Sequence, residues 1–146
     1  MITFRRFTAA DAAAVRELLY PDMAPEQISE MIDQWNEGFF DGKAFHMFAV
    51  LSDGDIVGTV SLFEQEGKCA SFGIEIGKPF RRRGIATGAG ELALQEAARL
   101  GYRTVVSQVR QDNAASIALH KSLGFSLTEA TVNRKGNPVF LYEKTL

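Results

Sequence analysis

The chain has 146 residues, of which 46% are hydrophobic and 23% are charged, and its formal net charge is −2. These values are typical of one folded domain, residues 1–146, and they exclude a disordered chain or an extended basic surface for nucleic acid. A single cysteine, Cys69, and the lack of long apolar runs argue against disulfides, thiolate zinc sites, membrane helices and secretion signals, so we expect a cytoplasmic protein without a metal.

The N-terminal part of the chain shows the pattern of one short strand and two amphipathic helices. Thr8 followed by Asp11 is a variant capping box, which indicates the start of the first helix. Pro25 suits the first turn of the second helix, and Gly38 suits its end. The expected segments are a strand from Ile2 to Arg6, a helix opening at Thr8, a helix from Pro25 to Gly38, and a loop from Phe39 to Gly42 with exposed aromatic rings.

The middle of the chain predicts three successive antiparallel strands. Phe45 to Leu51 is almost wholly apolar, as in a strand buried on both faces. Ile56 to Phe63 and Cys69 to Ile76 are rich in β-branched and aromatic residues. Turn-forming residues separate the strands at Ser52–Asp55 and at Glu66–Lys68.

The C-terminal part predicts a return to alternating elements. A long helix is expected from Ile85 to Leu100, a strand from Thr104 to Val109, and a short helix from Ala114 to Leu123. Phe125 to Val132 and Pro138 to Lys144 are expected to form a closing hairpin. The order β-α-α-β-β-β-α-β-α-β-β predicts a mixed α/β sheet with helices on both faces.

The segment Phe80–Thr87 carries the strongest local signal for a ligand. It leads from a strand into a helix through a basic turn that contains Arg81–Arg83 and Gly84. Backbone N–H groups converge at such a helix start, where the helix dipole favours an anion, most often phosphate. Three arginines add mobile positive charge for the same ligand. Taken alone, the segment predicts either a phosphate site or a solvated charged turn.

Two blocks of sequence, at this spacing and on these elements, resemble a known pair of signatures. Arg81-Arg82-Arg83-Gly84-Ile85-Ala86 fits (Gln/Arg)-x-x-Gly-x-(Gly/Ala). Asn113–Phe125 fits Asn-x-x-Ala/Ser-x-x-Leu-Tyr-x-x-x-Gly-Phe, except that His120 stands at the position of the tyrosine. Together with the element order, these blocks make the chain similar to the GNAT superfamily of acyl-CoA-dependent N-acetyltransferases over nearly its whole length.

The resemblance implies a fold and a co-substrate. The fold would have a central, mostly antiparallel sheet of six or seven strands with one splayed parallel pair. Acetyl-CoA would place its pyrophosphate on the basic turn and its pantetheine along a strand edge, and an amine would attack the thioester directly in a ternary complex. The residues implied to bind acetyl-CoA are Ile74, Ile76, Arg81, Arg82, Arg83, Gly84, Ile85, Ala86, Thr87 and Asn113.

Two residues are candidates for the catalytic chemistry. Glu75 is an ionisable residue inside an apolar strand, so it is expected to accept the proton of the amine, attract a cationic substrate, or form a salt bridge. His120 replaces the family's usual tyrosine, which is thought to protonate the departing thiolate. A charged imidazole could do the same, a neutral one is a weak donor, and a packing role is the alternative. Asn113 is expected to cap the short helix, contact the cofactor, or do both.

Several functional readings stay open at this point. Gly88–Ala93 formally matches a dinucleotide fingerprint but lies inside a helix, so that reading is rejected. A catalytically silent acyl-CoA-binding module is the alternative to an enzyme. The acceptor is expected to be a small cationic amine or a peptide amine, with Trp35, Phe39 and Phe40 as candidates for its pocket. The assembly is left open, with a homodimer among the options.

Overall fold

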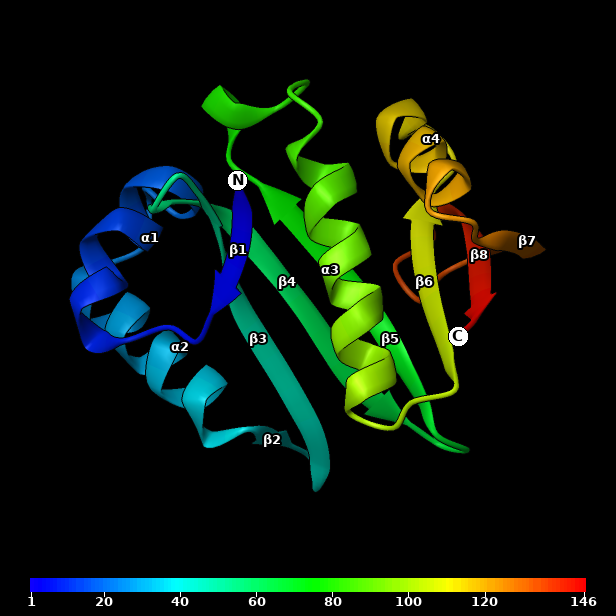
Figure 1. Ribbon diagram of the computed structural model, residues 1–146, viewed down its shortest axis with the longest axis horizontal. Helices are drawn as coiled ribbons and strands as arrows, with labels where there is room; N and C mark the ends of the chain where they lie inside the picture. The colour runs from blue at the N-terminus through cyan, green and yellow to red at the C-terminus, as the bar shows by residue number, and fades with distance from the viewer.

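The computed structural model describes all 146 residues as one mixed sheet flanked by four α-helices (Figure 1). The helices are α1 (Ala12–Leu19), α2 (Pro25–Glu37), α3 (Ile85–Arg99) and α4 (Ala114–Ser122). The strands are β1 (Ile2–Arg5), β2 (Phe39–Phe40), β3 (Lys43–Ser52), β4 (Asp55–Gln65), β5 (Cys69–Ile76), β6 (Thr104–Arg110), β7 (Ser126–Val132) and β8 (Pro138–Thr145). The predicted order of elements is confirmed, with shifts of a few residues at their ends.

Two short segments differ from the sequence expectation. Residues Phe39 and Phe40 were expected in a loop, but they pair with Lys43 and Ala44 as the small strand β2. Their aromatic rings are exposed as expected, at 66% and 61%. Before α1, the chain first makes a 3-10 turn at Ala9–Asp11, in which the Thr8 backbone N–H donates to the Asp11 carboxylate at 2.8 Å.

The sheet has the strand order β1-β3-β4-β5-β6-β8-β7, with β2 attached to β3. Every neighbouring pair is antiparallel except β5 and β6. These two parallel strands pair only from Cys69↔Thr104 to Ser71↔Val106. Beyond that rung, β5 and β6 continue without pairing to each other, which confirms the splayed parallel pair.

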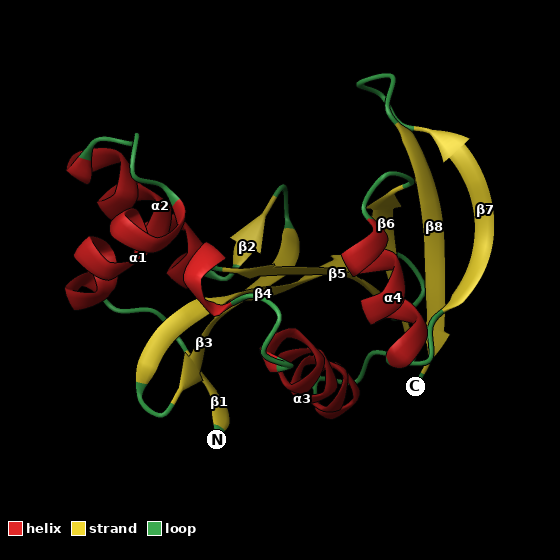
Figure 2. Cartoon of the chain, turned by 90° about the horizontal axis from the view of Figure 1, so that it is seen from above, coloured by secondary structure: helices red, strands yellow, loops and turns green.

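The helices lie on both faces of the sheet, as Figure 2 shows. Helices α1 and α2 pack on the face formed by β3 and β4, while α3 crosses the opposite face and α4 lies beside it. Gly90 of α3 brings the two helices together, because a Cβ there would lie 2.5 Å from the Leu123 Cδ1 atom.

Hydrophobic side chains form two separate cores, one on each face. The larger core lies under α3 and contains 18 buried residues, including Val60, Leu62 and Tyr142. The smaller core lies under α1 and α2, and its members are Phe7, Val15, Ile28, Ile32, Trp35 and Ala49. Strand β3 serves both cores because successive side chains alternate between faces. Because hydrophobic side chains pack on both faces of the sheet, it is a rigid support for the diverging ends of β5 and β6.

Candidate active site

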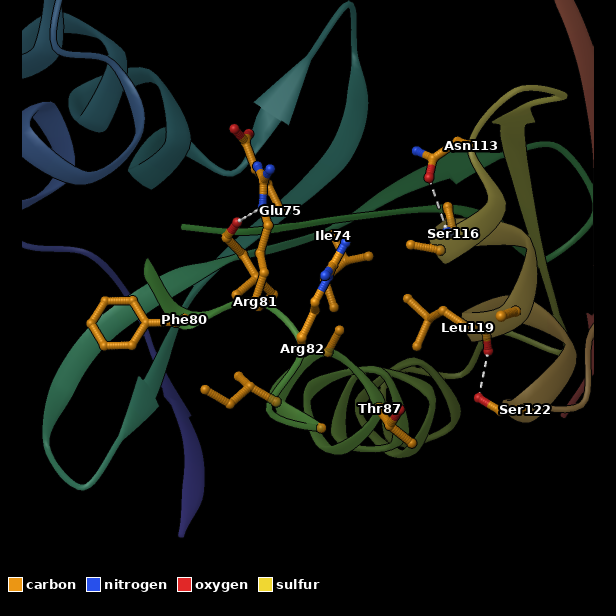
Figure 3. A pocket seen from close by; sticks show the side chains of 16 residues that line it. Ile74, Glu75, Phe80, Arg81, Arg82, Thr87, Asn113, Ser116, Leu119 and Ser122 are labelled. Carbon is orange, nitrogen blue, oxygen red and sulfur yellow. Dashed lines mark hydrogen bonds between the residues drawn. The ribbon is translucent and has the colours of Figure 1, made fainter. Parts of the chain in front are cut away.

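A cleft of about 750 Å³ opens where β5 and β6 diverge (Figure 3). One wall is the end of β5, the floor is the basic turn with the start of α3, and the other wall is α4. All the residues implied to bind the cofactor line this cleft except Arg83. The fold therefore brings the two sequence blocks, which lie far apart in the chain, onto facing walls.

The basic turn presents an uninterrupted row of free backbone donors. None of the N–H groups from Arg82 to Thr87 donates a hydrogen bond within the chain, and the first bond into α3 runs from Gly88 N to Gly84 O at 3.2 Å. Arg82 and Gly84 have left-handed φ values of 63° and 75°. Alternating left-handed residues turn successive N–H groups toward one side, as in anion-binding nests. Together with the N-terminus of α3, they form a site suited to a phosphate group.

The three arginines of the turn take different positions. The Arg81 Nε atom donates to the Ile76 carbonyl at 2.9 Å, which holds its side chain over the end of β5. Figure 3 shows Arg82 beside Ile74, reaching toward the space between β5 and α4, while Arg81 runs alongside Glu75. Arg83 turns away and places its guanidinium 5.7 Å from the centre of the Phe80 ring. Two of the three side chains are thus near the cleft in this structure.

The edge of β5 that faces the cleft does not pair with another strand beyond Ser71. The carbonyl groups of Phe72 and Ile76 both point to this edge, because they accept bonds from Ser107 Oγ and Arg81 Nε. Backbone groups alternate along a strand, so those of Ile74, midway between the two, point the same way. Ile74 lies beyond the last rung with β6. Its N–H and carbonyl groups are therefore placed to pair with an extended ligand.

Glu75 is exposed and faces the side of the sheet that carries α1 and α2. Its neighbours Ile74 and Ile76 pack toward the larger core on the opposite face. Burial raises the pKa of the Tyr20 phenol, and the nearby charge of Glu75 raises it further. In Figure 3 the Glu75 carboxylate points away from α3 and α4. Tyr20, at the end of α1, is thus a neighbour of the site that no local sequence pattern singled out.

Asn113 and Ser116 form the mouth of the cleft on α4. The Asn113 side-chain oxygen accepts the Ser116 backbone N–H at 3.0 Å, which is the expected helix cap. Helix α4 turns Ala115, Ala118, Leu119 and Ser122 toward the cleft. Leu119 packs against the larger core and also lines the cleft. The spacing of small and polar residues by three and four along this helix was the available signal.

His120 lies in the larger core and is not among the residues that line the cleft. It is 2% exposed, and its ring is surrounded by Phe72, Phe125 and Tyr142. Its Nδ1 atom lies 2.7 Å from the Ser116 carbonyl oxygen, and its Nε2 atom lies 2.8 Å from Ser107 Oγ. Burial lowers the pKa of the imidazole, while the Ser116 carbonyl acts in the opposite direction.

Other sequence candidates lie outside the cleft. Trp35 is buried in the smaller core against Phe7, and Phe39 and Phe40 lie on the exposed strand β2.

None of the helices has the length and apolar character needed to cross a membrane. No group of three or more His, Cys, Asp or Glu side chains is arranged to hold a metal ion.

Comparison with known proteins agrees with this geometry. A family model described as "Acetyltransferase (GNAT) domain" matches residues 2–126. The [ribosomal protein bS18]-alanine N-acetyltransferase of Escherichia coli (strain K12) is 29% identical over 107 residues, covering 71% of each chain. An uncharacterized prophage-derived N-acetyltransferase, YokL of Bacillus subtilis (strain 168), is 33% identical over 95 residues, covering 63% of this chain and 54% of that protein.

Solved structures share the fold. A RimL ribosomal L7/L12 alpha-N-protein acetyltransferase in complex with coenzyme A superposes with a TM-score of 0.87, covering 99% of this chain and 94% of that one at 18% identity. Spermidine N-acetyltransferase from Vibrio cholerae, in complex with CoA and spermine, gives a TM-score of 0.81, covering 99% and 95% at 19% identity.

Proposed function

The chain belongs to the GNAT acetyltransferase family and is an acetyl-CoA-dependent N-acetyltransferase, and we propose that its acceptor is a positively charged primary amine that attacks the thioester directly in a ternary complex. Binding of the co-substrate is supported best by the row of free N–H groups from Arg82 to Thr87, which faces the unpaired edge of β5 across one cleft. The cationic acceptor is supported by the exposed carboxylates between residues 17 and 41.

Acetyl-CoA fits this cleft as a bound co-substrate. The pyrophosphate would accept hydrogen bonds from the free N–H groups of Arg82 to Thr87, and the side chains of Arg81 and Arg82 would add positive charge. The pantetheine arm would pair with the backbone of Ile74 and Ile76 as an extra strand. Asn113 would contact the arm from α4 with its amide nitrogen, because its oxygen is engaged by the helix cap. Arg83 would join by turning from the Phe80 ring.

The chemistry follows from holding two reactants in one cleft. The deprotonated amine nitrogen attacks the thioester carbon, the C–S bond breaks, and CoA leaves as a thiolate that takes up a proton. Positioning lowers the barrier most, and a backbone N–H near the carbonyl oxygen stabilises the negative charge that develops there. Glu75 is proposed to accept the proton of the incoming ammonium, which would add roughly 10²–10⁴-fold to the rate.

His120 is proposed to assist the departing thiolate only through its hydrogen-bonded neighbours. The ring is buried, and its two nitrogens already face Ser107 and Ser116. Direct contact with a ligand in the cleft would require the side chain to move. A role that acts through Ser107 is compatible with the ring staying where it is.

The charge distribution supports a cationic acceptor. Between residues 17 and 41 there is no Lys, Arg or His, and none of the acidic side chains there forms an ion pair. This segment, the acidic lobe, carries seven exposed carboxylates: Glu17, Asp22, Glu26, Glu30, Asp33, Glu37 and Asp41. It comprises the end of α1 after Arg16, all of α2, and β2, and the two helices lie on the face of the sheet toward which Glu75 points. The names of the similar proteins give a ribosomal-protein alanine and spermidine as acceptors, and both present a primary amine.

A thiol-release assay with an amine panel tests the proposal. The panel contains a polyamine, a lysine-rich peptide, a peptide with a free N-terminal alanine, and a weakly basic fluorinated alkylamine that is uncharged at neutral pH. We expect the polyamine to give the highest kcat/KM and the neutral amine the lowest. Preference for the N-terminal alanine would move the acceptor class to peptides, and equal rates for the charged and neutral amines would overturn the cationic preference. Binding of acetyl-CoA without any acceptor-dependent release would instead indicate a silent acyl-CoA-binding module.

A further inference from the structure

A buried polar cluster lies at the closed end of the gap between β5 and β6. The last rung joins Ser71 to Val106, and the next residue on each strand is Phe72 and Ser107. Ser107 Oγ lies 3.3 Å from the Phe72 carbonyl oxygen and 2.8 Å from His120 Nε2. Ser107 is 7% exposed and His120 is 2% exposed. This cluster, Ser107 with His120 and the Phe72 carbonyl, is called the apex cluster below.

Counting protons shows that the apex cluster has two hydrogen-bonded states. His120 Nδ1 faces the Ser116 carbonyl oxygen at 2.7 Å, and a carbonyl can only accept, so Nδ1 carries a proton in both states. In the neutral ring, Nε2 is an acceptor and takes the single proton of the Ser107 hydroxyl. Ser107 then has no proton left for Phe72. In the charged ring, Nε2 donates to Ser107, whose own proton is free to bind the Phe72 carbonyl.

The two states differ in whether β5 and β6 are linked at the apex. The charged ring links them through Ser107, while the neutral ring leaves the Phe72 carbonyl free. That carbonyl belongs to the same strand edge as Ile74 and Ile76, the edge proposed to pair with the pantetheine arm. Phe72, Ser107 and His120 do not line the cleft, so the arm must extend past Ile74 to reach them. An arm that donates to the Phe72 carbonyl competes with the link made by Ser107, because both use the same acceptor.

We infer that Ser107 is a positioning residue that couples the protonation of His120 to acyl-CoA binding at the apex of the cleft. Acyl-CoA favours the neutral ring, which holds the Ser107 proton away from β5. This inference rests on the proposed position of acetyl-CoA. Removal of the Ser107 hydroxyl should uncouple the protonation of His120 from acyl-CoA binding. A residue that served only for packing would have no such effect.

The surroundings of His120 make this coupling measurable. Tyr142 on β8 is the titratable group among the side chains that contact the ring, alongside Phe72 of β5, Ser107 of β6, Ser116 of α4 and Phe125. No carboxylate, lysine or arginine forms an ion pair or a hydrogen bond with the imidazole. Its titration is therefore governed by burial, which lowers the pKa, and by the hydrogen bonds at its two ring nitrogens rather than by a neighbouring charge.

Nitrogen NMR of the two histidines tests the inference. The whole protein is titrated with and without saturating acetyl-CoA, in wild type, Ser107→Ala and Ser107→Thr. We expect the neutral His120 ring to carry its proton on Nδ1. Acetyl-CoA should lower the pKa of His120 by about 0.5–1 in wild type, which corresponds to the roughly three- to tenfold effect of one hydrogen bond. Ser107→Thr should keep this shift and Ser107→Ala should abolish it.

Two internal controls separate this result from trivial causes. His46 on β3 bonds to the hydroxyl of Tyr102, which lies between α3 and β6, at 3.2 Å, and the pKa of His46 should not respond to acetyl-CoA. Thr128→Val removes a similar hydroxyl-to-carbonyl bond, to Leu141 at 3.0 Å on the distant β7–β8 hairpin, and should leave the His120 shift intact.

The outcomes distinguish the inference from the proposed function. Three results would overturn the inference but not the proposed function. The first is a proton on Nε2 in the neutral ring, and the second is an equal pKa shift in wild type and Ser107→Ala. The third is a wild-type ring that does not titrate above about pH 4. Failure of acetyl-CoA to bind, with unchanged amide signals from Arg82 to Thr87, would instead overturn the proposed position of the cofactor.

Discussion

Gly84 determines at a single position whether the row of N–H groups can form. Its φ of 75° lies in the left-handed region, and a Cβ there would meet nothing within 4 Å. Glycine is required for the backbone angle rather than for space, since an L-residue pays about 1–2 kcal/mol for this conformation.

We therefore predict that Gly84→Ala weakens acetyl-CoA binding by about tenfold, because relief of the strain tilts the N–H groups away from the pyrophosphate. Isothermal calorimetry measures the change. Gly136→Ala is the matched control, with a φ of 82° and open space around it in the β7–β8 turn. It should cost similar stability and leave binding unchanged, and an equal loss of binding in both variants would contradict the role of Gly84.

Glu75 offers a second test at the level of one residue. If its carboxylate accepts the amine proton, Glu75→Gln should lower kcat by roughly 10²-fold or more with charged acceptors. If it only attracts the cation, KM should rise while kcat is retained. Steady-state kinetics with a polyamine separate these results. Glu91→Gln, an exposed change on the outer side of α3, is the control, and kinetics of Glu75→Gln that match it would remove Glu75 from the site.

Asp11 should make stability depend on pH. Its buried carboxylate accepts two bonds from Arg5, at 2.7 and 2.9 Å, and one from the Thr8 N–H. The hydrogen bond from Arg5 is the main reason that the pKa of Asp11 is lowered. A lowered pKa gives stability that is present above the unfolded value near 3.9 and is lost as the pH falls through the folded value.

Asp11→Asn is thus expected to destabilise the protein by about 1.5–3 kcal/mol at pH 7, with the difference narrowing below about pH 4. Urea unfolding at several pH values measures it. Asp53→Asn is the control, because Asp53 is a surface carboxylate paired only with the N-terminus, and such pairs contribute little. A constant difference between pH 7 and pH 3 would show that the ion pair is not the cause.

At the scale of elements, helix α4 holds one wall of the cleft and is fixed at its start by Asn113. Asn113→Ser keeps an oxygen able to cap the helix, so the melting temperature should stay close to that of wild type. The amide nitrogen is lost, so acetyl-CoA affinity should fall several-fold. Asn113→Ala should lose both, with a stability cost of about 1 kcal/mol. Wild-type affinity in Asn113→Ser would leave Asn113 as a cap alone.

The same helix shows why the sequence predicted the bounds of the helices and strands but not the orientation of every side chain. Local patterns predicted its start and end, because Asn113 is a common helix-capping residue and Gly124 is a common helix-terminating residue. They did not predict the orientation of His120, because α4 is apolar or small on most of its circumference and both the core and the cleft accept such residues. Only the packing of α4 against β6 and β8 decides which residues face inward.

Other features were beyond local reasoning for related reasons. The splay of β5 and β6 depends on two strands that α3 separates in the chain, so no single segment of sequence predicts it. Only the resemblance to a known family predicted it. Tyr20 lies next to Glu75 through a contact between distant parts of the chain. Strand β2 has only two residues, and it forms because the Asp41–Gly42 turn, with φ values of 52° and 75°, folds Phe39 and Phe40 back onto β3.

At the scale of the whole molecule, charge is distributed unevenly around the cleft, and the acidic lobe lies outside its lining. The formal net charge is only −2, yet the acidic lobe alone carries seven carboxylates without a basic residue. The phosphate end of the cleft carries three arginines. The basic turn would draw an anionic co-substrate, and the acidic lobe beside the sheet would draw a cationic acceptor, so that the two ligands approach from different sides.

This arrangement predicts an effect of salt on the acceptor. Glu26→Lys combined with Glu30→Lys places two cations on the exposed side of α2, so kcat/KM for a polyamine should fall several-fold at low salt. The fall should disappear near 0.5 M salt, where screening lengths shrink to a few ångströms. Glu129→Lys with Glu143→Lys, a matched double change on the distant β7–β8 hairpin, should leave kcat/KM unaltered. Because the acetyl-CoA end is unchanged, KM for acetyl-CoA should be the same in both variants. A loss that persists at high salt would mean that α2 acts through its fold rather than through its charge.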